Sequence, residues 1–150
     1  MGLYGVIVVG VDAAERSVKA LDHTIELTKL SGAELHIVMA YTPLSDHEVY
    51  ERTRGLTSRQ AANVGDDYDV KQLTHGASER ARENGVDSRL HLIVGPPGNA
   101  LVTVASEVGA DLVVVGNRGM TGVRHVLGSV PNHVTHHARC SVLVVDTHEA

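Results

Sequence analysis

The stretch from Asp111 to Pro131 reads DLVVVGNRGMTGVRHVLGSVP, and it decides the fold. It opens with the apolar run Leu112–Val115, a pattern typical of a strand buried on both faces of a parallel sheet. Gly116 and Gly119 then interrupt the run. Apolar residues recur every four positions in the segment that follows Gly128, as on one face of a helix: Val130, Val134 and Ala138. The predicted order is therefore strand, glycine-rich loop and helix N-terminus.

This order favours a phosphate site. The glycines at positions 116, 119 and 128 let the backbone approach a ligand and adopt positive φ. A helix N-terminus leaves N–H groups unpaired and carries about half a positive charge. Ser129 can act as the N-cap and can also donate its hydroxyl to a phosphate oxygen. The alternative is a plain surface loop in which Ser129 only caps the helix, because glycine spacing alone is a weak signal.

The motif Gly116-x2-Gly119-x8-Gly128-Ser129 resembles the nucleotide motif of the universal stress protein family, which has nine residues where this chain has eight. Three further segments share the resemblance: VVGVD at 8–12, LGSVP at 127–131 and SVLVV at 141–145. It covers nearly the whole chain and implies a single domain over residues 1–150. The implied fold is an α/β fold of the adenine-nucleotide alpha-hydrolase type, with helices on both faces of an open five-stranded parallel sheet of order 3-2-1-4-5.

Composition narrows the class of protein. The chain has 150 residues, of which 43% are hydrophobic, and it contains no Phe or Trp, so Val, Leu, Ile and Ala must fill the core. A net charge of −5 argues against a nucleic-acid partner or an anionic membrane surface. No apolar run approaches the roughly 20 residues of a membrane span, and no signal peptide is visible. The chain has one cysteine, Cys140, which cannot form an internal disulfide, so nothing indicates an oxidising compartment and we expect a cytoplasmic protein. We expect Cys140 to be a small, semi-buried structural residue.

Five strands and four helices are predicted from the hydrophobic pattern. The strands span 6–9, 34–41, 90–94, 112–115 and 142–145. The first helix carries a stripe of Ala14, Val18, Leu21 and Ile25 and ends at Ser31-Gly32. The next spans 70–84 with Val70, Leu73, Ala77 and Ala81 on one face, a third runs from an Asn99 cap to Gly109, and a fourth begins at Ser129. We expect the segment Leu44–Asp69 to be a mobile crossover loop with at most one short helix.

In the implied strand order, the first and fourth strands lie side by side and end at Asp12 and Gly116. Ligands of open α/β sheets bind beyond such strand ends. Asp12 is placed to bind a base, a ribose or a Mg²⁺ ion that bridges phosphates. The equal alternative is that Asp12 caps the next helix, with Glu15 as its capping-box partner.

The family resemblance implies further contacts. Gly10 and Val11 would line an adenine pocket, backbone groups of Ala40 would bind the adenine edge, and Val115 would cover the base. The ribose and phosphates would be surrounded by Gly116, Gly119, Gly128, Ser129 and Val130. Arg118 and Arg124 lie in the loop and either neutralise phosphate charge or remain solvated.

These expectations point to an ATP-binding stress-response or regulatory protein. The chain has no Gly-Lys-Ser/Thr tripeptide and no Gly-x-Ser-x-Gly elbow, so we expect little or no hydrolysis. The resemblance implies a homodimer that pairs two copies of the strand Val142–Val145. One alternative is a homologue that binds cyclic AMP or no ATP. A slow ATPase or an adenylating enzyme is a less favoured one.

Ten histidines are many for this length. His125, His133, His136 and His137 cluster near the last helix, and His133 and His137 are four residues apart. Such a pair can bind a transition metal or gain charge near pH 6.5. The favoured interpretation is a solvated helix face.

Overall fold

A computed structural model describes residues 2–12, 16–61, 66–117 and 128–147. Its sheet has five parallel strands in the order β3-β2-β1-β4-β5, which confirms the predicted architecture. The elements in chain order are β1 (Val6–Val11), α1 (Arg16–Ser31), β2 (Glu34–Tyr41), α2 (Asp46–Thr53), α3 (Ser58–Ala61), α4 (Asp66–Glu83), β3 (Ser88–Val94), α5 (Pro97–Val108), β4 (Leu112–Gly116), α6 (Ser129–His137) and β5 (Ser141–Val145).

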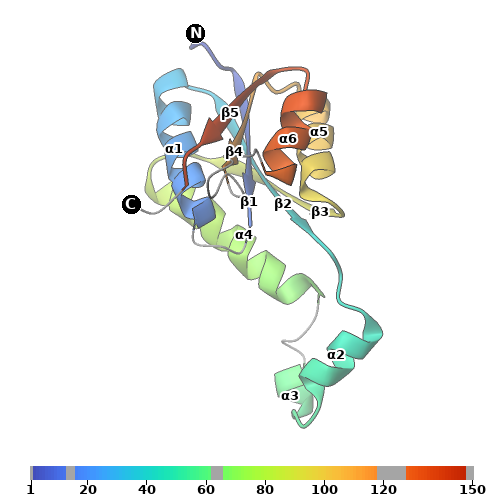
Figure 1. Ribbon diagram of the computed structural model, residues 1–150. Helices are drawn as coiled ribbons and strands as arrows, with labels where there is room; N and C mark the ends of the chain where they lie inside the picture. The colour runs from blue at the N-terminus through green and yellow to red at the C-terminus, as the bar shows by residue number, and fades with distance from the viewer. Residues whose placement is uncertain (1, 13–15, 62–65, 118–127, 148–150) are drawn as a thin grey trace.

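Helices cover both faces of the sheet. Helices α1 and α4 lie on one face, while α5 and α6 lie on the other (Figure 1). The strands β1 and β4 therefore read as continuous apolar runs, because successive side chains enter opposite hydrophobic layers. The strand β2 follows the same pattern except for Glu34 at its start and the buried His36. Val8 packs toward α5, whereas Ile7 and Val9 pack toward α1, and all three are fully buried.

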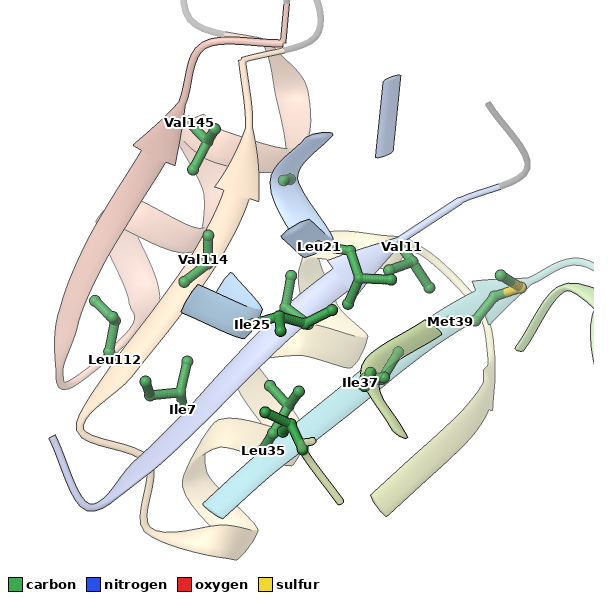
Figure 2. Packing of buried hydrophobic residues seen from close by; sticks show 14 residues of the cluster. Ile7, Val11, Leu21, Ile25, Leu35, Ile37, Met39, Leu112, Val114 and Val145 are labelled. Atoms are coloured by element: carbon green, nitrogen blue, oxygen red, sulfur yellow. The ribbon is translucent and has the colours of Figure 1, made fainter. Parts of the chain in front are cut away.

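The larger hydrophobic cluster lies on the α1 and α4 side (Figure 2). Leu21 and Ile25 of α1 pack there, as predicted. Val18, predicted on the same stripe, is instead 37% exposed, whereas Thr24 and Thr28 are buried. Their hydroxyls donate to the carbonyls one turn back, Thr24 Oγ1 to Ala20 O at 2.7 Å and Thr28 Oγ1 to Thr24 O at 2.8 Å. These bonds satisfy the polar groups, so the apolar pattern misplaced the buried face.

The crossover after β2 holds more helix than expected. Two short helices, α2 and α3, extend away from the sheet (Figure 1), and neither buries a residue. Helix α2 begins with a capping box, in which Glu48 N donates to Ser45 Oγ at 3.2 Å and Ser45 N donates to Glu48 Oε1 at 3.4 Å. The prediction of at most one short helix was therefore wrong.

Helix α4 begins at Asp66 and not at residue 70, and the side chain of Val70 lies outside the described residues. Ala81 is fully buried as predicted, but Leu73 is 41% exposed and the neighbouring Thr74 is buried in its place.

Helix α5 begins at Pro97, with Pro96 as its N-cap, so the predicted Asn99 cap was wrong. Proline fits the first helical position because its fixed φ is helical and its missing N–H would have no partner there. Gly109 ends the helix at φ 65, and its N–H bonds back to Ala105 and Ser106. Within the described residues, no helix has the length and apolar character needed to cross a membrane.

Candidate functional site

A cavity of about 260 Å³ lies beyond the carboxyl ends of β1, β2 and β4. This is the edge at which the strand order reverses direction around β1 and β4. The lining residues are Gly10, Val11, Asp12, Ser17, Ala20, Val38, Ala40, Pro97, Leu101, Val115, Gly116, Ser129, Val130, Pro131 and Thr147.

One part of the cavity is apolar. Val38, Leu101 and Val115 line it, and each is at most 3% exposed. Gly10 lies against them, and a Cβ built on it would be 2.9 Å from Leu101 Cδ1. The absence of a side chain at position 10 therefore lets α5 pack closely on β1, with Leu101 shaping the wall of the cavity.

The first turn of α6 forms another part of the cavity wall. The first intrahelical bond runs from Asn132 N to Gly128 O at 2.9 Å. The N–H groups of Ser129 and Val130 come before this first bond, so they have no acceptor within the helix. Pro131 has no N–H. The helix presents two main-chain donors and the positive end of its dipole to the cavity that these residues line.

The N-cap of α6 is Gly128, and Ser129 is the first helical residue. The expectation that Ser129 caps the helix was wrong. Gly128 has a φ of −61°, and the φ of Gly116 is not positive either, so the backbone angles at these two positions do not require glycine. At Gly116 the reason is a close approach, because a Cβ there would be 2.9 Å from Thr147 Cγ2.

Asp12 is partly buried and lines the cavity. Its carbonyl accepts a bond from Ser17 Oγ at 3.0 Å, which ties the end of β1 to the first turn of α1. The predicted capping partner Glu15 lies outside the described residues. One carboxylate beside a phosphate is a common donor set for Mg²⁺, so this residue fits the expected ion.

The structure brings most of the predicted residues together. Those that line the cavity are Gly10, Val11, Asp12, Ala40, Val115, Gly116, Ser129 and Val130. Gly128, the N-cap of α6, immediately precedes Ser129 in the chain. Arg118, Gly119 and Arg124 lie outside the described residues.

Sequence reasoning missed seven lining residues: Ser17, Ala20, Val38, Pro97, Leu101, Pro131 and Thr147. Several of these stand in the first two turns of helices that follow strands ending at the cavity. The βαβ pattern could have identified them. Thr147 follows the last strand and carries no such signal.

Two histidines of α6 stack on each other, and the described residues show no metal site around them. The rings of His133 and His137 stack with centroids 4.2 Å apart, and His137 Nδ1 donates to His133 O at 2.8 Å. Among the described residues, no group of three or more His, Cys, Asp or Glu side chains could hold a metal ion. His125 lies outside the described residues. Cys140 is half-buried as expected, and burial raises the pKa of its thiol.

Comparison with known proteins identifies one family. The model of the universal stress protein family matches residues 3–146. The universal stress protein Rv1636 of Mycobacterium tuberculosis is 34% identical over 149 residues, covering 98% of this chain and 99% of its own.

Solved structures agree. A universal stress protein in complex with cyclic AMP is 33% identical, with a TM-score of 0.73 over 97% of this chain and 98% of that chain. A universal stress protein from Archaeoglobus fulgidus is 25% identical, with a TM-score of 0.71 over 96% of this chain and 100% of that chain.

Proposed function

The chain belongs to the universal stress protein family, and from this we propose that its cavity binds an adenine nucleotide in a regulatory role. The observation that carries the proposal is the meeting of an apolar pocket with the N-terminus of α6 at the carboxyl ends of β1 and β4. A nucleotide has the same two-part chemistry, because a planar base with apolar faces is linked through ribose to an anionic phosphate.

The base is assigned to the apolar part, between Val38, Leu101 and Val115. Backbone groups near Ala40, at the end of β2, are available to bind the adenine edge. The phosphate is assigned to the first turn of α6, where the N–H groups of Ser129 and Val130 and the Ser129 hydroxyl offer donors. The site thus needs no lysine of the Walker type.

ATP is the first candidate ligand, because the glycine motif resembles that of the ATP-binding members of the family. Cyclic AMP is the second, because the solved relative at 33% identity was determined in complex with it. Parallel titrations with the two nucleotides decide between them.

We propose that Asp12 binds Mg²⁺ carried by the nucleotide, since this acidic residue lines the cavity. The sequence lacks a Gly-Lys-Ser/Thr tripeptide, which supports slow or no hydrolysis. Phosphate release from ATP, compared between wild type and Asp12→Asn, tests this: a rate that depends on Asp12 would make the protein an ATPase.

We also propose a homodimer formed through β5. This strand is one edge of the sheet, and an uncovered edge offers unpaired backbone groups to a second copy. Sedimentation should give twice the mass of one chain, and a monomer at every concentration would contradict the proposal.

Ser129→Ala tests the phosphate assignment. Loss of one hydrogen bond should weaken nucleotide binding by about 1 kcal/mol, roughly fivefold. Ser106→Ala makes the same change on an exposed turn near the end of α5 and should have no effect. Equal affinities for the two variants and wild type would place the phosphate elsewhere.

A further inference from the structure

The first turn of α5 and the second turn of α6 are in direct contact. Gly98 is buried in α5, and His133 of α6 packs against it. A Cβ built on Gly98 would be 2.9 Å from His133 Cδ2 and 3.0 Å from its Cβ and Cγ. Non-bonded carbons prefer about 3.5–4.0 Å. The histidine therefore occupies the space that a side chain at position 98 would need, and the two helices approach closely here.

The imidazole of His133 is also held from within its own helix. Its ring stacks on that of His137, with the centroids 4.2 Å apart and the planes 21° from parallel. The His137 ring is fixed in turn, because its Nδ1 donates to the main-chain carbonyl of His133 at 2.8 Å. The ring that meets Gly98 is therefore one of a stacked pair, which restricts the rotamers that it can adopt.

This contact joins the two helices that carry the two parts of the cavity wall. On α5, Leu101 lies about one turn after Gly98 and lines the apolar part. On α6, Ser129 lies about one turn before His133 and lines the part with the unpaired main-chain donors. The two helices lie side by side (Figure 1). Their separation at this contact therefore helps to set the distance between the apolar wall and the donors.

The two helices are not equally anchored in the core. Helix α5 buries Gly98, Ala100, Leu101, Val104 and Ala105, whereas α6 buries Pro131 and Val134. Extra volume at the contact should therefore displace α6 and its donors more than α5 and its apolar wall.

We propose that His133 is a positioning residue that sets the spacing between the base part and the phosphate part of the cavity. The inference rests on the proposed nucleotide function. His133 is not among the residues that line the cavity, so it acts through the backbone of α6 and not by touching the ligand. A nucleotide occupies both parts and depends on their spacing. Adenosine has the same base and ribose without phosphate, so it depends on the base part.

A purely structural role predicts a different result. If the contact only packed α5 against α6, its disruption would lower the free energy of unfolding and leave the ratio of nucleotide to adenosine affinity unchanged. If it sets the spacing, that ratio falls.

The test is calorimetric titration of the full chain with ATP, cyclic AMP and adenosine. Gly98→Ala should weaken the preferred nucleotide at least about fivefold, the effect of one misplaced hydrogen bond, while adenosine affinity is unchanged. Gly76→Ala is the matched control, because a Cβ at position 76 meets nothing within 4 Å. It should bind like wild type.

Substitutions at His133 provide a second measurement in case Gly98→Ala does not fold. His133→Ala removes the ring and should weaken the nucleotide about threefold, whereas His133→Phe keeps a planar ring and should lose less. In combination, His133→Ala should partly restore the affinity of Gly98→Ala, because it vacates the space of Cγ and Cδ2. His136→Ala is the control on the same helix, since His136 is exposed, and it should bind like wild type.

An adenosine loss equal to or greater than the nucleotide loss would overturn the positioning role while leaving the nucleotide site intact. Wild-type nucleotide affinity in His133→Ala, or in a folded Gly98→Ala protein, would do the same. A wild-type protein that binds neither nucleotide would overturn the proposed function and this inference with it.

Discussion

Gly10→Ala tests how the cavity at the carboxyl ends of β1, β2 and β4 is built. A Cβ at position 10 would lie 2.9 Å from Leu101 Cδ1 and 3.2 Å from Cδ2. Non-bonded carbons prefer about 3.5–4.0 Å, so the Leu101 side chain must move by roughly half an ångström or more. Leu101 is 2% exposed and lines the cavity, so the open direction for that movement is into the ligand space.

We expect Gly10→Ala to lower the free energy of unfolding by about 1–3 kcal/mol, the usual cost of overpacking a core. Nucleotide affinity should fall as well, because Leu101 is displaced toward the base. Urea denaturation followed by circular dichroism measures the first effect, and calorimetry measures the second.

Gly76→Ala is the matched control for this change. Gly76 lies on an exposed turn of α4, and a Cβ built there meets nothing within 4 Å. Here alanine should stabilise the protein by about 0.5–1 kcal/mol, because it restricts the unfolded chain and favours helix. The same substitution should therefore lower the free energy of unfolding at position 10 and raise it at position 76.

A double-mutant cycle locates the strain. Leu101→Ala alone should cost about 2–5 kcal/mol through the cavity it leaves. Combined with Gly10→Ala it should cost less than the sum of the two single effects, because the added methyl occupies vacated space. Strict additivity, or a Gly10→Ala protein as stable as wild type, would refute the reasoning.

Three further predictions follow from local geometry. Gly109→Ala should destabilise by about 1–2 kcal/mol in urea denaturation, because position 109 has φ 65. Burial, and next the neighbouring His36, lowers the pKa of His91 below 6.5, and His36 Nδ1 lies 2.8 Å from His91 Nε2. The unfolded chain therefore takes up that proton first, and stability should decline as pH falls from about 6.5 toward the folded pKa. His91→Gln should flatten this decline in urea midpoints measured across pH, and an unchanged slope would contradict the assignment. Cys140 should react slowly with alkylating reagents at mild alkaline pH, because burial raises its thiol pKa. Labelling as fast as that of an exposed cysteine would contradict this.

Much of the fold could be predicted because parallel strands buried on both faces appear in sequence as largely apolar runs. The run at 112–115 falls within β4. The predicted span 34–41 coincides with β2, which is apolar apart from Glu34 and the buried His36. The position of the cavity was predicted from the strand order that the family resemblance implies, because that order places the ends of the first and fourth strands side by side.

The errors have physical causes. Buried Thr24 and Thr28 satisfy their hydroxyls within α1, so a search for apolar residues passed over them. The α2 and α3 segment buries nothing, and helices without an apolar face leave no periodic signal. The contact of Thr147 with Asn117 joins residues 30 positions apart and depends on the register of β4 and β5, which the sequence pattern does not contain. The single-domain assignment and the ligand contacts of individual residues remain predictions.

The most direct test of the central proposal is calorimetric titration of the purified chain with ATP and with cyclic AMP, each with and without Mg²⁺. We predict saturable binding of one nucleotide per chain, weakened in Ser129→Ala and retained in Ser106→Ala. No binding of either nucleotide by the wild-type protein, under conditions in which it is folded, would contradict the proposal.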